Sequence, residues 1–349
     1  MKLKNILIAS TLILCGAFMA CNDDETPAPP QAPVYDLTGF AKGADVSWLT
    51  EMEKSGKKFY NANGREMECM TLLRDLGMNS IRLRVWVNPS EGWCNESDLL
   101  AKAWRAKQLG MRLMIDFHYS DTWADPGQQT KPTAWTGYSM EELKTAVAEH
   151  TREVLNTLKN NEITPEWIQV GNETGNGMLW NEGKASENMA QYAALNNAGY
   201  DAAKEVFPHA KVIVHLQSGN DNSLYRWIFD GLKENGGKWD VIGMSLYPTA
   251  ETWQEMNTQC LANMNDMITR YSSEVMVCEV GMPWDDAETA KKFLKDLLAK
   301  AQGIDGEKCL GIFYWEPQSY GNWNGYTLGA FDNNGKPTVA LEGLNDERD

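Results

Sequence analysis

Short apolar runs alternate with amphipathic stretches along most of the chain. The runs are rich in valine, isoleucine and aromatic residues, and most lack a strict alternation of apolar and polar positions. This pattern is typical of strands that are buried on both faces, as in a parallel sheet. It predicts eight strands, at residues 40–48, 79–87, 111–119, 166–172, 211–217, 240–248, 274–281 and 309–317.

Helical patterns separate these strands. Residues 139–161 begin with a serine and carry glutamates in the first turn, which are features of a helix N-terminus. Residues 64–78 place apolar side chains at three-residue steps, roughly on one side of a helix. Further helices are expected at residues 97–109, 187–206, 221–235, 253–271 and 286–301, with a short last helix from about Thr338.

The eightfold alternation of strand and helix predicts an α/β fold, in which residues 36–349 form one (β/α)8 TIM barrel. A doubly wound sheet is the alternative. That fold is less favoured because no glycine-rich phosphate loop follows the first strand.

The N-terminus differs in composition from the rest of the chain. Lys2 and Lys4 precede an apolar run that is too short to span a bilayer, which predicts a secretory signal peptide at residues 1–20. The tetrapeptide "FMAC" resembles the lipobox of bacterial lipoproteins, and this resemblance implies lipidation of Cys21. A signal peptide that is cleaved elsewhere is the alternative.

Residues 21–35 are expected to form a tether between the lipid and the barrel. Four prolines in "TPAPPQAP" favour an extended, semi-rigid spacer. The acidic run "NDDE" resembles surface-export signals of some Gram-negative lipoproteins, although it could equally be a solvated spacer. We therefore expect a protein anchored in the outer membrane by its lipid alone, facing the cell surface.

Charge and composition narrow the class of ligand. The formal net charge of −16 argues against nucleic acid or an anionic membrane surface as a partner. Fourteen tryptophans are many for this length, and indole faces commonly stack on sugar rings. Apart from Cys15 and Cys21 there are five cysteines without CxxC spacing, so neither a metal site nor a full disulfide framework is indicated. A monomer is expected.

The ends of the predicted strands carry the residues that are suited to chemistry. In a TIM barrel the active site lies at the C-terminal ends of the strands. In chain order, these ends offer Asp45, Arg82, Arg84, Trp86, Asp116, His118, Tyr119, Asn172, Glu173, His215, Tyr247, Glu279, Trp315 and Glu316.

Glu173 and Glu279 form the most informative pair. They end the fourth and seventh predicted strands, and a glycine follows each within two residues. These strands lie on roughly opposite sides of an eight-stranded barrel, so the two carboxyl groups can face each other across its mouth. Two carboxyls about 5–5.5 Å apart suit glycoside hydrolysis by double displacement, with one nucleophile and one acid/base. Each residue taken alone could instead be an ordinary loop glutamate.

The nucleophile must stay ionised, so it needs a cation or hydrogen-bond donors nearby. Arg84 and Tyr247 are candidates. Arg82 and Arg84 lie on the same face of their strand, and either could instead form a salt bridge with a barrel carboxylate such as Asp116. The sequence alone does not separate the two arginines.

The remaining candidates have a functional and a structural interpretation. His118 and His215 could contact a sugar or could only hydrogen-bond within the protein. Trp86 and Trp323 could bind sugar or belong to the core, and Trp323 is the better platform because polar and glycine residues surround it in "YGNWNGY". The segment "FDNNGK" at residues 331–336 could bind calcium, but a turn is expected.

Several motifs together resemble the endo-β-1,4-galactanases of glycoside hydrolase family 53. The resemblance covers residues 38–340, and the long third- and fourth-strand motifs are specific. The motifs are "GADVS", "IRLRVWVNP", "DFHYSDTWADPGQQTKPTAW", "IQVGNETGNGMLWNEGK", "SLYP", "CEVGMPW" and "GIFYWEPQ".

This resemblance implies a retaining barrel of clan A. It implies that Glu173 is the acid/base, that Glu279 is the nucleophile and that Asn172 contacts the sugar 2-hydroxyl. It also implies roles around the sugar for four further residues: Trp315 as the floor of subsite −1, and Arg84, His118 and Tyr247 around the nucleophile.

The implied substrate is β-1,4-galactan, the side chain of pectic rhamnogalacturonan I, which would be cut into galacto-oligosaccharides. Many bacterial members of the family carry a structural calcium. No tight acidic cluster follows the seventh or eighth strand here, and "PWDDAE" at 283–288 is better interpreted as a helix start. We therefore expect neither calcium nor a cofactor.

Two other functions stay open. One is a glycan-binding surface lipoprotein without catalysis, although the presence of both glutamates speaks against it. The other is a retaining barrel hydrolase that acts on another β-1,4-glycan, such as mannan, xylan or glucan.

Overall fold

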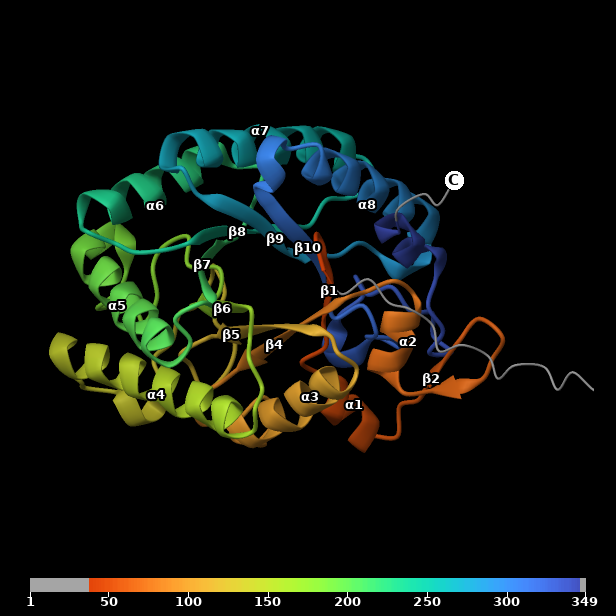
Figure 1. Ribbon diagram of the computed structural model, residues 1–349, viewed down its shortest axis with the longest axis horizontal. Coiled ribbons are helices and arrows are strands. Elements are labelled where there is room, and N and C mark those ends of the chain that lie inside the picture. The colour runs from red at the N-terminus through yellow and green to blue at the C-terminus, as the bar shows by residue number, and fades with distance from the viewer. Residues whose placement is uncertain (1–37, 346–349) are drawn as a thin grey trace, which may run out of the picture. The chain divides into compact units, whose positions relative to one another are not determined.

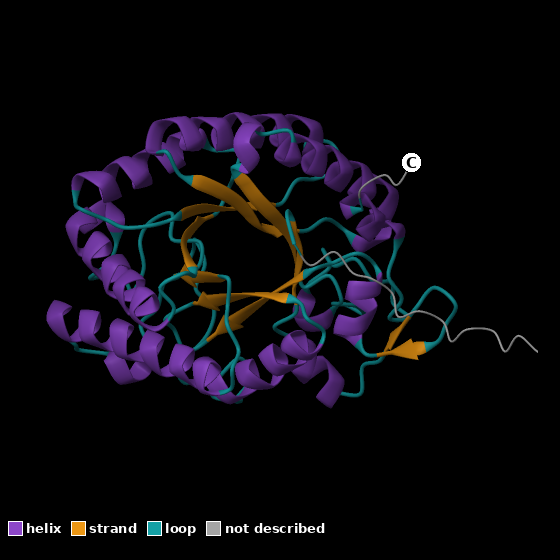
Figure 2. Ribbon diagram, viewed as in Figure 1, coloured by secondary structure: helices purple, strands orange, loops and turns teal. Residues whose placement is uncertain are grey.

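In the computed structural model, which describes residues 38–345, eight parallel strands close into a barrel in the order β1-β10-β9-β8-β7-β6-β5-β4. Helices form a ring around the strands (Figure 1 and Figure 2). The predicted (β/α)8 barrel is confirmed, and the doubly wound sheet is excluded. The barrel strands are β1 (Ala41–Asp45), β4 (Ser80–Val85), β5 (Arg112–Phe117), β6 (Trp167–Val170), β7 (Lys211–Leu216), β8 (Val241–Leu246), β9 (Glu274–Val280) and β10 (Cys309–Trp315).

The helices follow the predicted alternation. Ser139 and Glu142 form a reciprocal capping box at the start of α4, as the sequence indicates. The helices are α1 (Leu49–Lys54), α2 (Cys69–Asp75), α3 (Glu96–Gln108), α4 (Met140–Asn160), α5 (Ala185–Val206), α6 (Asn222–Glu234), α7 (Trp253–Tyr271) and α8 (Ala287–Gln302), with 3-10 turns η1 (Thr133–Trp135), η2 (Trp284–Asp286), η3 (Asp305–Glu307), η4 (Trp323–Gly325) and η5 (Val339–Leu344).

Three local predictions need correction. The helix expected at 64–78 begins only at Cys69, because the Glu68 side chain caps it by accepting hydrogen bonds from the Met70 and Thr71 amides. A hairpin of β2 (Phe59–Tyr60) and β3 (Glu66–Met67) precedes it. Helix α1 was not expected, and the segment after Thr338 is a 3-10 turn rather than an α-helix.

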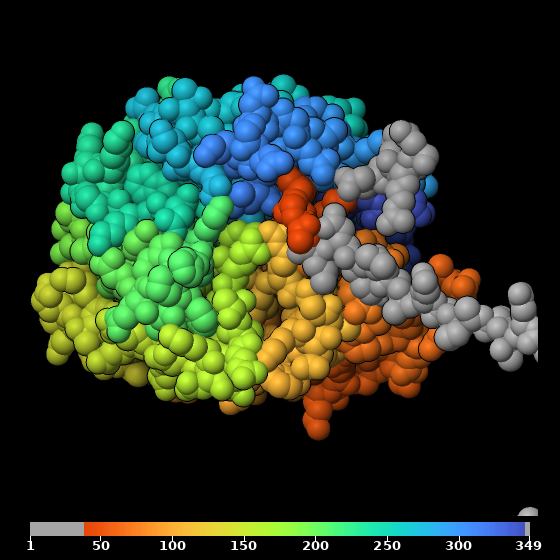
Figure 3. Space-filling view, in the orientation of Figure 1, coloured from red at the N-terminus to blue at the C-terminus, as the bar shows by residue number. Residues whose placement is uncertain are grey.

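Packed side chains fill the middle of the ring that the ribbons leave open (Figure 3). An apolar cluster inside the barrel takes one or two residues from each of seven strands, and the Phe313 ring occupies the space beside Gly43. The barrel is therefore a packed core that supports a site at one end of the strands.

Residues 1–37 and 346–349 lie outside the described part of the chain. The expected signal peptide, the lipidated Cys21 and the whole tether fall there, so they stay predictions, as do the domain boundaries. Within the described residues, no helix combines the length and apolar character needed to cross a membrane. The five cysteines of this part are buried free thiols.

Candidate active site

A cavity of about 530 Å³ opens at the C-terminal ends of the barrel strands. Its size falls in the range of small-molecule sites. Aromatic and carboxylate side chains dominate the wall. The lining residues are Trp48, His118, Trp123, Ala124, Asp125, Asn172, Glu173, Tyr247, Glu279, Trp315, Asn324, Gly325, Tyr326 and Leu328.

A β-bulge positions Glu279. Met244 of β8 pairs with Val277 of β9, but the next residue, Ser245, pairs with Glu279, which leaves Cys278 without a direct partner. Cys278 belongs to the apolar cluster inside the barrel. Strict alternation would therefore turn Glu279 outward toward the helices, and the bulge instead lets its carboxylate face the inside.

Arg82 and Tyr247 hold the Glu279 carboxylate from two sides. Arg82 Nη2 lies 2.9 Å from Glu279 Oε1, and the Tyr247 hydroxyl donates to Oε2 at 2.8 Å. The same guanidinium pairs with Asp45 at 2.8 Å and with Asp116 at 2.9 Å. One buried cation thus fixes three carboxylates and orients the candidate nucleophile.

The expectation that Arg84 serves Glu279 is wrong. Arg84 Nη1 lies 2.6 Å from Glu316 Oε1, and its guanidinium sits 4.4 Å from the centroid of the Trp123 ring. Both arginines face the same side of β4, as predicted, but they occupy successive levels along the barrel. Arg84 therefore supports the aromatic wall of the cavity.

Glu173 enters the cavity because the chain turns sharply after β6. Gly171 has a φ of 80°, and a side chain there would meet Thr174 Cγ2 at 2.6 Å. Glu173 itself has a φ of 46°, in the left-handed region that non-glycine residues seldom adopt. Such strain is characteristic of functional positions, and here it belongs to a carboxylate residue that lines the same cavity as Glu279.

Asn172 is held in one orientation. Its Oδ1 accepts from Arg82 Nη2 at 3.0 Å and from Gln169 Nε2 at 3.1 Å, while its Nδ2 donates to the Ala124 carbonyl at 2.8 Å. An amide nitrogen carries two N–H groups, so one remains to meet a ligand in the cavity that Asn172 lines.

Burial governs the protonation of the two glutamates. It raises the pKa of both Glu173 and Glu279, and their mutual repulsion raises that of Glu279 further. Arg82 lowers the pKa of each, but it pairs directly with Glu279 alone. The two carboxyls therefore share a proton, and we assign it to Glu173 because Glu279 has the cationic partner.

Aromatic rings form much of the cavity wall. Trp315 packs edge-on against Trp48 at 5.0 Å and against Tyr326 at 4.7 Å between ring centroids. Trp123 lies 5.9 Å from Trp315. The structure thus places Trp315 on the cavity wall, and its role as the floor of subsite −1 stays a prediction. The structure adds Trp48, Trp123 and Tyr326 to the wall, which the sequence did not single out. Trp48 ends the first predicted strand, and Trp123 lies in the quoted third-strand motif.

His118 also lines the cavity, and its tautomer follows from its contacts. The Trp86 indole and the Ala124 amide both donate to Nδ1 at 3.2 Å, so the proton is on Nε2, which donates to Asp116 at 3.0 Å. Trp86 therefore acts through His118 rather than at the cavity wall.

Three other candidates lie behind the wall. Asp45 is fully buried against Arg82, and the fully buried His215 ring contacts Asn172 Oδ1 at 3.0 Å and Ser245 Oγ at 2.8 Å. Trp323 packs against the core, while its neighbours Asn324 and Gly325 reach the cavity.

The possible calcium segment forms a turn. The Asp332 carboxylate accepts from the Asn334 and Lys336 amides, so local backbone donors occupy it. Among the described residues, no three or more histidine, cysteine, aspartate or glutamate side chains gather as metal ligands would. The expected absence of calcium stays a prediction.

Comparison with known proteins gives consistent matches. The sequence model of glycosyl hydrolase family 53 matches residues 41–344. The chain is 33% identical over 301 residues to a probable arabinogalactan endo-β-1,4-galactanase A of Neosartorya fischeri, covering 79% of this chain and 83% of the relative. A solved structure from work on two fungal β-1,4-galactanases has a TM-score of 0.81 at 28% identity, covering 88% of this chain and 99% of that one. The family 53 catalytic domain from Ignisphaera aggregans has a TM-score of 0.79 at 29% identity, covering 90% and 97%.

Proposed function

The chain belongs to glycosyl hydrolase family 53, and from this premise we propose that it is an arabinogalactan endo-β-1,4-galactanase. It hydrolyses internal β-1,4-galactosidic bonds of galactan, in the type I arabinogalactan side chains of pectin, and releases galacto-oligosaccharides. The observation that carries this function is the shared cavity of Glu173 and Glu279, in which only Glu279 pairs with a cation.

The first step of the reaction forms a covalent intermediate. An oxygen of Glu279 attacks the anomeric carbon of the bound galactosyl unit, and the bond to the leaving oxygen breaks. Glu173 gives its proton to that oxygen, so the leaving chain departs as a neutral alcohol. Tyr247 and Arg82 keep Glu279 ionised and aligned until it attacks.

The second step releases the sugar. Glu173, now ionised, takes a proton from water, and the resulting hydroxide attacks the anomeric carbon while Glu279 leaves. The configuration at that carbon is inverted twice and so retained. Both glutamates return to their starting protonation, so neither a metal nor a cofactor is needed for the proton balance.

The wall supplies contacts for the sugar. Trp315 offers an aromatic face beside Glu279, and aromatic faces bind the C–H surface of a sugar. Asn172 directs its remaining N–H into the cavity, where it meets the hydroxyl next to the reacting carbon. His118 lines the same space with its ring held by Asp116.

Product analysis tests this function against the two alternatives. The mature protein is incubated with β-1,4-galactan and, in parallel, with β-mannan, xylan and cellulose, and products are resolved by chain length. Galacto-oligosaccharides from galactan alone are expected. Release from another polymer would overturn the substrate, while retardation in a galactan gel without any release would favour a binding lipoprotein.

We further propose that Cys21 is lipidated and anchors the enzyme in the outer membrane, facing the cell surface, as a monomer. The apolar run before "FMAC" and the acidic, proline-containing segment after it support this location. A Cys21→Ala variant is expected to move from the membrane fraction to the soluble fraction. Removal of the wild-type protein from intact cells by added protease tests the surface orientation, and light scattering tests the monomer.

A further inference from the structure

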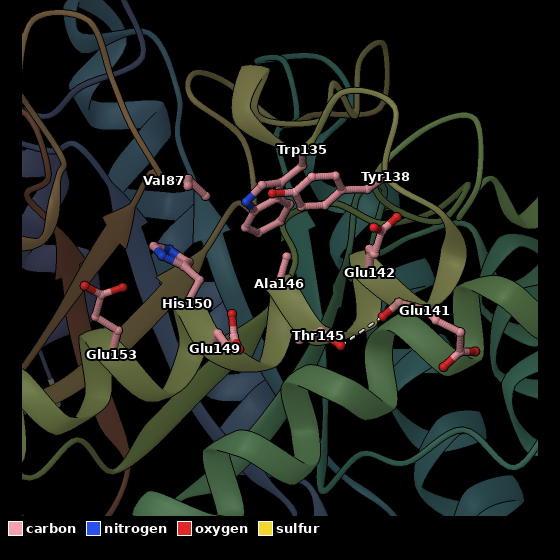
Figure 4. A pocket seen from close by; sticks show the side chains of 10 residues that line it. All are labelled: Val87, Trp135, Tyr138, Glu141, Glu142, Thr145, Ala146, Glu149, His150 and Glu153. Atoms are coloured by element: carbon pink, nitrogen blue, oxygen red, sulfur yellow. Dashed lines mark hydrogen bonds between the residues drawn. The ribbon is translucent and has the colours of Figure 1, made fainter.

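A second cavity, of about 520 Å³, lies on the outer side of the barrel between the loop that follows β5 and helix α4. Figure 4 shows side chains along one face of α4, with the rings of Trp135 and Tyr138 above them. No residue that lines this second cavity also lines the catalytic cavity. It is therefore a separate site that the reaction does not use.

Two aromatic rings form one side of this cavity. Tyr138 is 36% exposed, so part of its ring is open to a ligand in the cavity. Trp135 ends the 3-10 turn η1, and its ring meets the His150 ring edge-on at 6.3 Å. Rings at the border of a cavity offer an apolar face to a ligand whose edges are polar.

Helix α4 supplies hydrogen-bonding groups on the other side. Thr145, Glu149 and Glu153 follow one another at four-residue steps, so they share one face of the helix (Figure 4). The carboxylates of Glu149 and Glu153 have no ion pair or hydrogen bond within the described part of the chain. Free acceptors thus line the cavity next to the aromatic rings.

His150 adds an unsatisfied polar group to the same cavity. Its side chain is only 8% exposed, yet its Nε2 has no hydrogen-bond partner among residues 38–345. Burial lowers the pKa of His150 to about 4, so the ring is neutral near pH 7 and does not balance the carboxylates. Buried polar atoms without a partner are rare in proteins, and one in a cavity wall points to a ligand.

The chemistry of the wall selects the class of ligand. No lysine or arginine lines the cavity, which disfavours an anion. The lining carboxylates and the imidazole do not gather as metal ligands would, which disfavours a tightly held cation. Aromatic faces beside carboxylate acceptors suit a neutral, polyhydroxylated ligand, whose hydroxyls donate to carboxylates and whose C–H face packs on a ring.

We propose that this cavity is a second carbohydrate site, which binds a short segment of β-1,4-galactan outside the catalytic cavity. The proposal rests on the proposed function, because it takes the polymer as the ligand. One loop joins the two sites. It supplies His118, Trp123, Ala124 and Asp125 to the catalytic cavity, and Trp135 and Tyr138 to the second cavity. A polymer held at the second site is thereby concentrated near the glutamates.

Variants of the second site test the proposal. Tyr138→Ala and the double variant Glu149→Gln/Glu153→Gln are compared with wild type and with Trp104→Ala, a control that removes an exposed aromatic from α3. Retardation in a gel containing polymeric galactan is measured, together with kcat and KM for the polymer and for galactotetraose. We expect about tenfold weaker binding and a similarly higher KM for the polymer, which corresponds to loss of one modest contact, with galactotetraose kinetics unchanged.

The outcomes separate the two proposals. If wild type fails to hydrolyse galactan at all, the proposed function fails. If hydrolysis is intact but the site variants bind the polymer like wild type, or lose no more than Trp104→Ala, the second site is overturned. Loss of polymer binding on chelation of divalent cations would also overturn it, in favour of a cation site.

Discussion

Arg82 Nη2 lies 2.9 Å from Glu279 Oε1 inside the barrel, and the same guanidinium also holds Asp45 and Asp116. Burial raises the pKa of Glu279, and Arg82 is the nearest charge that opposes this effect. The ion pair therefore decides which of the two glutamates is ionised, and so which one attacks the sugar.

Replacing Arg82 tests this role. Lysine keeps the charge but cannot bridge three carboxylates at once, so Arg82→Lys is expected to lower kcat/KM on the order of 100-fold, as for loss of one preorganised charge contact. The acid limb of the pH profile should also move to higher pH, because Glu279 is then harder to ionise.

Arg112→Lys is the matched control for this variant. Arg112 pairs with Glu166 near the N-terminal end of β5, away from the cavity. The Arg112→Lys variant should change the stability of the protein without moving the pH profile of kcat/KM. An unchanged acid limb in Arg82→Lys would show that Arg82 does not control the ionisation of Glu279.

Glu173→Ala separates proton transfer from nucleophilic attack. Loss of a general acid is expected to slow polymer hydrolysis by about 10²–10⁴-fold. Substrates with a good leaving group need no proton, so they should keep part of their rate, and added azide should accelerate turnover and give a β-galactosyl azide. Polymer hydrolysis at the wild-type rate would show that Glu173 is not the general acid. Formation of the same azide product by Glu279→Ala would reverse the roles of the two glutamates.

The pH dependence follows from the shared proton. Activity requires ionised Glu279 and protonated Glu173. Since burial raises the pKa of both, the optimum should lie above the ordinary carboxyl range, and activity should fall at higher pH as Glu173 ionises. With a substrate that needs no acid catalysis, Glu173→Gln should lose the alkaline limb and keep the acid limb. Persistence of the alkaline limb would assign it to another group.

Glu316 should affect stability in a pH-dependent manner. Burial raises its pKa to about 7, above the ordinary value of 4.5. Between these values the folded protein binds more protons than the unfolded chain, so wild-type stability falls as pH rises from 4.5 to 7 and is then level. Glu316→Gln removes this dependence.

Thermal unfolding across pH checks this prediction. The Tm of Glu316→Gln should rise relative to that of wild type between pH 4.5 and 7. The corresponding gain in free energy of unfolding is on the order of 1–3 kcal/mol. Loss of the carboxyl group that accepts a hydrogen bond from Arg84 adds an offset that does not change with pH. Parallel Tm curves for the two proteins would contradict the raised pKa.

The barrel could be predicted from the sequence because its strands are apolar runs at regular spacing, and each predicted run contains a barrel strand. The hairpin of β2 and β3 was missed because each strand has only two residues, too few to show a period. Helix α1 was missed for a similar reason, since its six residues are short for a helical pattern.

The two glutamates could be predicted as catalytic residues because they end strands. The residues that surround them could not be predicted from the sequence. Arg82 and Arg84 alternate to the same face, and only their different depths in the barrel decide which one meets Glu279. The bulge that turns Glu279 inward depends on pairing with β8, and no glycine or proline in β9 marks it. Such features arise from contacts between strands that are distant in the sequence.

The most direct test of the account is to trap the glycosyl-enzyme. The protein is incubated with an activated 2-deoxy-2-fluoro-β-galactoside. Its fluorine slows both steps, and its good leaving group restores the rate of the first step alone, so the glycosyl-enzyme accumulates. The labelled peptide is then found by mass spectrometry. The account predicts one galactosyl unit attached to Glu279 and none on Glu279→Gln. Label on Glu173, or turnover of unmodified galactan with inversion at the anomeric carbon, would contradict it.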